Sequence, residues 1–274
     1  MGSMPRSIWK GAISFGLVTI PIKLYSATEE KDISFRQVHA EDGGRIKYKR
    51  ICDKDGKEIP FSEIAKGYEA PDGRMAILEK SDFDDLPLPS AKQVEVVQFV
   101  DAEEIDPTYI NKTYFLEADG PGAKPYVLLR DALDKTGKAA LVKVAIRSRE
   151  QLAMIRTKGD LLLMHTMLWP DELRDGEFAA PASDVSVSDA EVTMAQSFIE
   201  ALDGPFEPEQ YHDDYRAALE EVVNAKLSGS PMPSEDSEEA PEEAEVVDLV
   251  AALRASVDAA KKRREAAKGE SKTG

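Results

Sequence analysis

The 274-residue sequence is poor in cysteine and histidine, the side chains that most often build disulfides and transition-metal sites. A single cysteine, Cys52, excludes an internal disulfide and a multi-cysteine zinc site, and a lone thiol fits a reducing cytoplasm. The three histidines, His39, His165 and His212, show no metal-ligand spacing with one another or with Cys52. His165 lies in an apolar strand pattern and is interpreted as a core histidine. We therefore predict no metal and no cofactor.

The sequence also lacks catalytic motifs and long apolar runs. It contains no GxGxxG, GxxxxGK(S/T), GxSxG or HExxH pattern, so no catalytic residue and no enzyme activity are predicted. The longest strongly apolar stretch, residues 161–169, is too short to span a bilayer, and no signal segment is recognised at the start. Residues 1–5 are interpreted as a tag remnant and the start of the chain. A cytoplasmic protein without membrane contact is expected.

Positive charge is scarce, because 35 Lys and Arg stand against 52 Asp and Glu and leave a net charge of −17. The deficit is uneven: residues 1–80 hold 14 basic and 12 acidic side chains, whereas residues 181–274 hold 9 and 22. Residues 109–158 hold 10 basic and 5 acidic side chains. Fields are screened beyond a Debye length of about 8 Å in physiological salt. A local cationic surface for nucleic acid is therefore compatible with this acidic chain.

The first two thirds of the chain are patterned mainly as strands. Residues 7–25 alternate in part between apolar and polar side chains and are interrupted by Gly11, Gly16 and Pro21. This pattern predicts one long, bent strand rather than a helix.

Further elements are predicted along the same region. β-Branched and aromatic residues predict strands at 94–100, 113–116 and 140–146. Residues 151–169 are predicted to form a hairpin whose turn is Lys158-Gly159-Asp160, and residues 125–135 a short amphipathic helix. No internal repeat is detected.

The last third changes to helical spacing. Ser188 and Glu191 form a capping box, and apolar residues then recur at helical intervals until Asp203-Gly204-Pro205. A second helix is predicted to carry Tyr211 to Val223. The two helices form a predicted arm, residues 188–227.

An acidic linker and a basic tail follow the arm. Residues 228–245 are rich in Ser, Pro and acidic side chains and contain no base, which predicts a disordered linker. Residues 246–274 are predicted to form an amphipathic helix and a basic tail. The basic cluster of this helix is a candidate DNA contact: Lys261, Lys262, Arg263 and Arg264. A partner helix is a second possible ligand and is favoured, with DNA, over a membrane surface, because the apolar stripe lacks Trp and Phe anchors. A helix that packs back on the core is the remaining alternative.

Two basic stretches are candidates for binding phosphates. Arg45, Lys47 and Lys49 would share one face of a strand, with about 6.6 Å between neighbours, close to the phosphate repeat of DNA. The second stretch includes Lys143, Arg147, Arg149, Arg156 and Lys158. Ordinary solvated strand faces are the alternative for both. Aromatic residues other than Tyr48 do not interleave with the basic ones, so backbone contacts to duplex are favoured over base stacking.

Several separate motifs resemble bacterial Ku proteins. The opening SIWKGAISFGLVTIPIKLY, residues 7–25, carries the strongest similarity. Other matches follow in order: Lys66–Glu69, Ile77–Leu86, Ile105–Pro107, Tyr114–Leu116 and Leu161–Asp171. The resemblance covers residues 6–225, and the linker and final helix lie outside it.

The resemblance implies a fold and a function. The expected fold is α+β, with an antiparallel β-barrel and a β-bridge that form a ring in a homodimer, plus a C-terminal helical arm. Residues 6–187 would be the core, with the bridge at about 27–80. Such proteins encircle the ends of double-stranded DNA without reading sequence and recruit the multi-domain ATP-dependent ligase (ligase D type) in non-homologous end joining. A nucleoid-associated location would follow.

In this interpretation phosphates are contacted by one set of cations: Arg36, Arg45, Lys47, Lys49, Arg50, Lys54, Arg147, Arg149 and Arg156. The alternative is a β-barrel scaffold that binds RNA rather than DNA ends. Some relatives in this family carry a pair of cysteines near the bridge. Only Cys52 is present here, which argues against a metal role.

Overall fold

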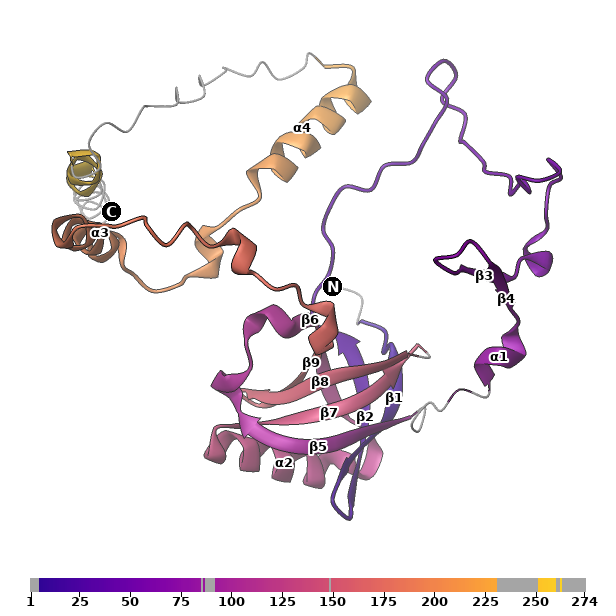
Figure 1. Cartoon of the computed structure of the whole chain (residues 1–274), viewed down its shortest axis with the longest axis horizontal. Helices are drawn as coiled ribbons and strands as arrows, with labels where there is room; N and C mark the ends of the chain where they lie inside the picture. Colours follow the sequence, from indigo (N-terminus) through magenta and orange to yellow (C-terminus); the bar gives the residue numbers. More distant parts are fainter. Residues whose placement is uncertain are drawn as a thin grey trace. The chain divides into compact units, whose positions relative to one another are not determined.

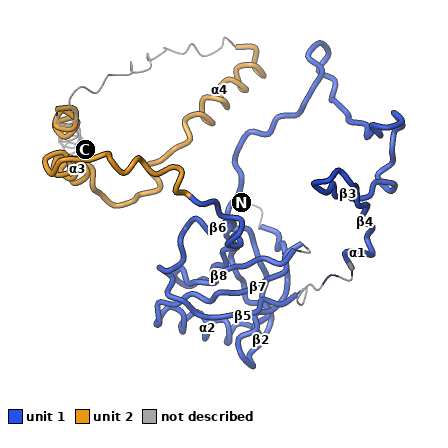
Figure 2. Tube along the Cα trace, viewed as in Figure 1, with its two compact units in different colours: residues 1–175 blue, residues 176–274 orange. Residues whose placement is uncertain are grey.

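The computed structural model describes residues 5–84, 86, 92–147, 149–230, 251–259 and 262. The chain divides into two compact units, residues 1–175 and 176–274 (Figure 2). The predicted linker from residue 231 onward, and the tail residues Lys261, Arg263 and Arg264, lie outside the described residues.

A closed β-barrel forms the centre of the first unit (Figure 1). Its strand order is β1-β2-β6-β9-β8-β7-β5. The strands are β1 Trp9–Phe15, β2 Val18–Ser26, β5 Gln93–Asp101, β6 Ile110–Ala118, β7 Lys138–Ile146, β8 Arg149–Lys158 and β9 Leu161–Met167. Neighbouring strands are antiparallel except β1 and β5, which close the barrel in parallel. The predicted α+β class with a β-barrel is confirmed.

The barrel interior is filled by side chains that alternate along the strands. On β2, Ile20, Ile22 and Leu24 are fully buried, and the intervening residues are more exposed. This period of two places one face of each strand in the core. Burying one such side chain contributes about 1.5–3 kcal/mol. The barrel therefore has a stable apolar interior.

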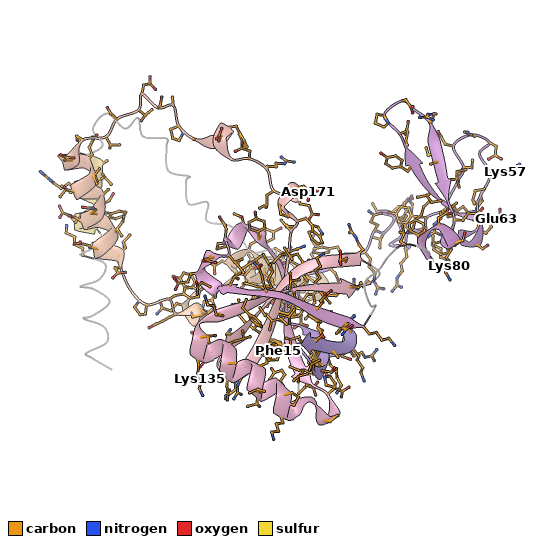
Figure 3. The ribbon with its side chains drawn as sticks, turned by 60° about the horizontal axis from the view of Figure 1, so that its bottom comes forward. Phe15, Lys57, Glu63, Lys80, Lys135 and Asp171 are labelled. Carbon is orange, nitrogen blue, oxygen red and sulfur yellow. The ribbon has the colours of Figure 1, made fainter. Side chains whose placement is uncertain are left out.

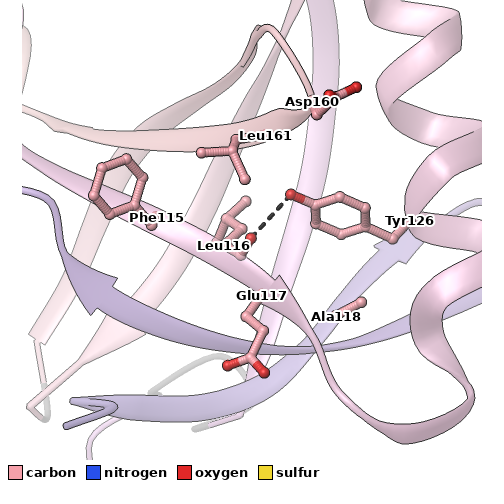
Figure 4. Close-up of a pocket in the computed structure, with 7 residues that line it drawn as sticks. All are labelled: Phe115, Leu116, Glu117, Ala118, Tyr126, Asp160 and Leu161. Atoms are coloured by element: carbon pink, nitrogen blue, oxygen red, sulfur yellow. Dashed lines mark hydrogen bonds between the residues drawn. The ribbon is translucent and has the colours of Figure 1, made fainter. Parts of the chain in front are cut away.

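Helix α2, Ala123–Thr136, packs on the barrel and was predicted within one or two residues. It buries Tyr126, Leu129 and Leu133, and Gly137 ends it with a left-handed φ of 65°. The Tyr126 hydroxyl donates to the Leu116 carbonyl at 2.9 Å and accepts from the Leu162 N–H at 2.7 Å. The ring thereby joins β6 to β9 beside a small pocket of about 330 Å³ (Figure 4).

The prediction of one long strand at residues 7–25 is wrong. The segment is a hairpin, in which β1 and β2 pair from Trp9 with Leu24 to Phe15 with Val18. Gly16 has a φ of 59°, so it reverses the chain in a two-residue turn whose tip, Leu17, is fully exposed. The glycine makes a turn here and not a bend.

Gly11 lies where the barrel closes and allows two segments of backbone to approach closely. A Cβ on Gly11 would lie 2.3 Å from the Lys92 carbonyl oxygen and 2.1 Å from the Trp9 ring. The close approach allows the Ala12 N–H to donate to that carbonyl at 3.0 Å. Glycine is therefore needed where β1 meets the start of β5.

The other predicted strands are confirmed. Strands β5, β6 and β7 contain the predicted segments, and β8 and β9 form the predicted hairpin around Gly159, whose φ is 54°.

Between β2 and β5 the chain leaves the barrel in an extension, residues 27–84 (Figure 1). This extension contains the region predicted as the bridge. It has a small two-stranded sheet, β3 Lys66–Glu69 with β4 Met75–Leu78, followed by the short helix α1, Lys80–Asp84. Residues 45–50 were expected to be strand-like, but only Arg45 pairs, in an isolated bridge with Val38. The backbone N–H and C=O groups of the neighbouring residues make hydrogen bonds within local turns instead.

The second unit is helical. Helix α3, Asp189–Leu202, begins with the predicted Ser188–Glu191 capping box and ends before Asp203, and helix α4 spans Asp214–Ser228. Tyr211 was expected on the second helix, but it lies before it, because α4 starts after an Asp213 N-cap. Residues 251–259 are also helical.

Short 3-10 helices complete the description: η1 Phe61–Glu63, η2 Ala102–Glu104, η3 Pro107–Tyr109, η4 Gly120–Gly122, η5 Pro170–Glu172, η6 Glu177–Ala179 and η7 Pro208–Gln210. Among the described residues, no helix has both the length and the apolar character needed to cross a bilayer.

Candidate nucleic-acid interface

The extension begins with two consecutive turns of the same design. In the first, His39 N–H donates to Gly44 O at 2.8 Å, Gly43 N–H to His39 O at 2.9 Å, and Ile46 N–H to Gln37 O at 3.1 Å. Gly43 has a φ of 69°.

The second turn repeats this pattern thirteen positions later. Cys52 N–H donates to Lys57 O at 2.8 Å, Gly56 N–H to Cys52 O at 2.9 Å, and Ile59 N–H to Arg50 O at 2.8 Å. Gly56 has a φ of 70°. The chain therefore contains a local structural repeat that the sequence analysis did not find. Few residues are shared between its copies, because the repeat is defined by backbone hydrogen bonds.

An aspartate closes each turn. Asp42 accepts from the Gly44 N–H at 2.8 Å, and Asp55 accepts from the Lys57 N–H at 3.2 Å. Bonds from the Lys57 backbone and ammonium, then from the Cys52 thiol, lower the pKa of the Asp55 carboxyl. These residues support the loops. Across the described part of the chain, no three His, Cys, Asp or Glu side chains gather to hold a metal ion.

The predicted cations of the extension lie on and between these turns. All six are exposed: Arg36, Arg45, Lys47, Lys49, Arg50 and Lys54. Lys49 pairs with Glu58 at 2.6 Å, and the Arg50 guanidinium lies 5.3 Å from the centroid of the Phe61 ring. The described residues provide no ion-pair partner for Arg36, Arg45, Lys47 or Lys54. Their charges are available to a ligand.

A second group of cations lines a cleft of about 880 Å³, called the tip cleft below. It lies between the extension and the β7–β8 turn. Its lining residues are Ser62, Ile64, Ala65, Lys66, Leu78, Glu79, Lys80, Phe83, Leu86, Arg147 and Arg149. Four of them are basic and one is acidic. The structure thus brings the predicted Arg147 and Arg149 next to two lysines of the extension.

The β7–β8 turn places Arg147 in an uncommon conformation. Ile146 pairs with Arg149, so two residues connect the strands, and Arg147 has a φ of 52°. Two-residue hairpin turns require such a positive φ. No other non-glycine residue in the described chain has one. The left-handed conformation costs an L-residue about 1–2 kcal/mol, so the turn would accept glycine more easily than arginine.

Arg156 lies elsewhere and is not among the residues that line the tip cleft. Its Nε donates to His165 Nε2 at 2.9 Å, and His165 Nδ1 is 2.9 Å from Thr113 Oγ1. Because arginine can only donate, His165 is the neutral tautomer with its proton on Nδ1. Burial of the ring and then the Arg156 charge lower the pKa of His165. His165 is thus the buried, satisfied histidine that the sequence predicted.

Three residues of the tip cleft were not predicted from the sequence: Lys66, Lys80 and Phe83. The Lys66 ammonium lies 4.3 Å from the centroid of the Phe83 ring, and Lys143 lies 6.0 Å from that of Trp169. Along the sequence, aromatic residues other than Tyr48 do not interleave with the basic ones. In the folded chain, however, these two lysines lie close to aromatic rings. Of the predicted tail cations, Lys262 is exposed, and the other three lie outside the described residues.

The fold and this surface define a β-barrel protein with a long extension that carries exposed cations. The family model described as the Ku70/Ku80 beta-barrel domain matches residues 14–194. The chain belongs to the Ku family.

Curated relatives share the name "Non-homologous end joining protein Ku". The Frankia casuarinae protein is 48% identical over 256 residues, covering 93% of this chain and 64% of the relative. The Streptomyces griseus protein is 49% identical over 261 residues, covering 95% and 65%. "Non-homologous end joining protein Ku 2" of Saccharopolyspora erythraea is 46% identical over 266 residues, covering 95% and 87%. The chain thus spans about two thirds of the first two relatives.

Proposed function

We propose that this protein binds the ends of double-stranded DNA, without reading their sequence, in non-homologous end joining. The observation that carries the proposal is the exposed, largely unpaired set of cations on the extension of a chain whose net charge is −17. Phosphate neutralisation supplies most of the affinity in sequence-independent binding. The names of the relatives favour DNA ends over the RNA alternative.

The phosphate-contacting set is proposed to be Arg36, Arg45, Lys47, Lys49, Arg50, Lys54, Arg147 and Arg149, with Lys66 and Lys80 added from the tip cleft. Arg156 is kept in the proposed set as a weaker phosphate contact, because its Nε–H already donates to His165. Phosphate contacts fix a protein on the duplex but carry no sequence information. This arrangement suits a protein that must accept any broken end, and binding rather than enzymatic turnover is the proposed activity.

A homodimeric ring is part of the proposal. Helices α3 and α4 bury no residue, and Ile199, Leu202, Tyr215 and Leu227 are 62–81% exposed. Exposed apolar surface of this extent is typical of an interaction site. An isolated two-stranded hairpin such as β3–β4 is also marginal alone. A second copy of the chain would cover such surfaces and close a ring around DNA. The helical arm is proposed, in addition, to recruit an ATP-dependent ligase of the ligase D type.

The test is a charge reversal on the extension. Replacing Lys47, Lys49 and Arg50 with Glu should weaken binding to blunt duplexes of different sequence by the same factor. The matched control reverses three exposed lysines outside the proposed interface, Lys112, Lys124 and Lys135. Mobility-shift assays at moderate salt measure both. Unchanged affinity in the extension variant, or an equal loss in the control, would reject the proposed surface.

A further inference from the structure

We propose that the tip cleft holds an unpaired nucleotide at a DNA end, such as the first base of a single-stranded overhang. This inference rests on the proposed function and adds to it a second kind of binding site. Contacts to duplex phosphates need cations alone. Binding of single strands combines cations with an aromatic surface on which a base stacks. The tip cleft contains both.

The cations of the cleft can hold the phosphate. Lys66, Lys80, Arg147 and Arg149 are exposed and come from two parts of the chain far apart in sequence. Figure 3 shows Lys80 on the extension, on the same part of the molecule as Glu63 and Lys57. Arg147 lies in the two-residue β7–β8 turn, and Arg149 is the first residue of β8.

The apolar part of the cleft can hold the base and sugar. Ile64 is 46% exposed and Leu86 is 54% exposed, and Leu78 and Phe83 complete this surface. The half-buried Phe83 ring already attracts a cation, Lys66 at 4.3 Å, so a base stacked there would lie beside a positive charge. The volume of about 880 Å³ is within the range of about 300–1,000 Å³ for sites that hold small molecules.

The phosphate backbone of a duplex would match fewer residues of the tip cleft than an unpaired nucleotide would. The outer surface of a duplex presents phosphates, and it would leave Phe83, Leu78 and Leu86 without an apolar partner. Beside the turns of the extension, the Arg50 guanidinium lies over the ring of Phe61, which is 76% exposed. Phe61 therefore offers a matched control: it is an aromatic ring beside a cation on the same extension, and it does not line the tip cleft.

The experiment measures binding of the full chain to hairpin duplexes with one open end. The open end is blunt or carries three unpaired thymidines on the 3′ or the 5′ strand. Wild type should bind at least one overhang about fivefold more tightly than the blunt end, which is about 1 kcal/mol at 1.4 kcal/mol per factor of ten. Phe83→Ala should abolish this preference, because the affinity for the overhang should fall more than the affinity for the blunt end. Phe83→Tyr and Phe61→Ala should both keep the preference.

A second measurement locates the base. 5-Iodouracil placed in the overhang should cross-link to Phe83 or to another residue that lines the tip cleft, and the same base at a paired position should not. Equal wild-type affinity for blunt and overhang ends would overturn the inference. The inference would also be overturned if Phe83→Ala lowered the affinity for blunt and overhang ends equally, or if Phe61→Ala abolished the overhang preference as Phe83→Ala does. If wild type binds none of these duplexes, the proposed function itself fails, which is a different result.

Discussion

Replacing Arg147 with glycine should separate folding from DNA binding. Arg147 occupies a two-residue turn at a φ of 52°, where an L-residue is about 1–2 kcal/mol less stable than in its usual conformations. Glycine removes this strain, and its greater freedom in the unfolded chain offsets about 0.5–1 kcal/mol of the gain. The free energy of unfolding should therefore stay the same or rise by up to about 1.5 kcal/mol. For a chain of this size the melting temperature would rise by at most about 6 °C.

The same change should weaken DNA binding. Each phosphate contact that is lost lowers the slope of log affinity against log salt concentration by about 0.9, so Arg147→Gly should give a shallower slope by about that amount for each protomer. Fluorescence anisotropy with a blunt duplex measures the slope, and thermal unfolding followed by circular dichroism measures the stability. Lys135→Gln, which removes one charge on α2 (Figure 3), is the control and should change neither.

Two results would refute this reasoning. A fall in melting temperature of more than about 4 °C would mean that the arginine side chain supports the turn, contrary to the strain argument. An unchanged salt slope with normal stability would mean that the β7–β8 turn does not touch phosphate.

Other consequences follow from the barrel and the arm. Tyr126→Phe leaves two buried backbone groups without their hydroxyl partner, so the free energy of unfolding should fall by about 1–3 kcal/mol in urea titrations; no change would mean that water replaces the hydroxyl. The pKa of His165 is lowered in the folded state by burial and by Arg156, so the unfolded state binds more protons and stability should fall as the pH drops below the unfolded value of about 6.5. This slope should flatten in His165→Gln, and an identical pH profile would contradict the assignment. Truncation after Leu227 should retain binding to blunt linear duplex while it shortens the lifetime of the complex, and a complete loss of binding would show that the tail belongs to the DNA-binding core.

Much of the fold could be predicted from local sequence patterns. The β8–β9 hairpin, helix α2 and the capping box of α3 depend on turn residues, apolar spacing and caps that lie within a few positions of one another. Gly16 shows the limit of this approach, because a glycine in an alternating segment predicts a bend as readily as a reversal. The pairing of β1 with β2 decides between them, and pairing is not a local property.

The candidate site could be predicted less completely. Clusters of cations such as Lys47 and Lys49 are visible along the sequence. The tip cleft instead combines Phe83 with Arg147 and Arg149, more than sixty positions away, and only the folded chain brings them together. The repeated turns of the extension are defined by backbone bonds and by the φ of Gly43 and Gly56, so few side chains reveal them.

The central claim is that two copies enclose a duplex that enters from a free end. The most direct measurement compares binding to a linear duplex with binding to a relaxed, covalently closed circle of the same length and sequence, at the same salt concentration. A ring that threads onto ends should bind the linear DNA and leave the circle free. Equal affinity for the two forms would contradict the account, because a surface that holds phosphates from one side does not need an end.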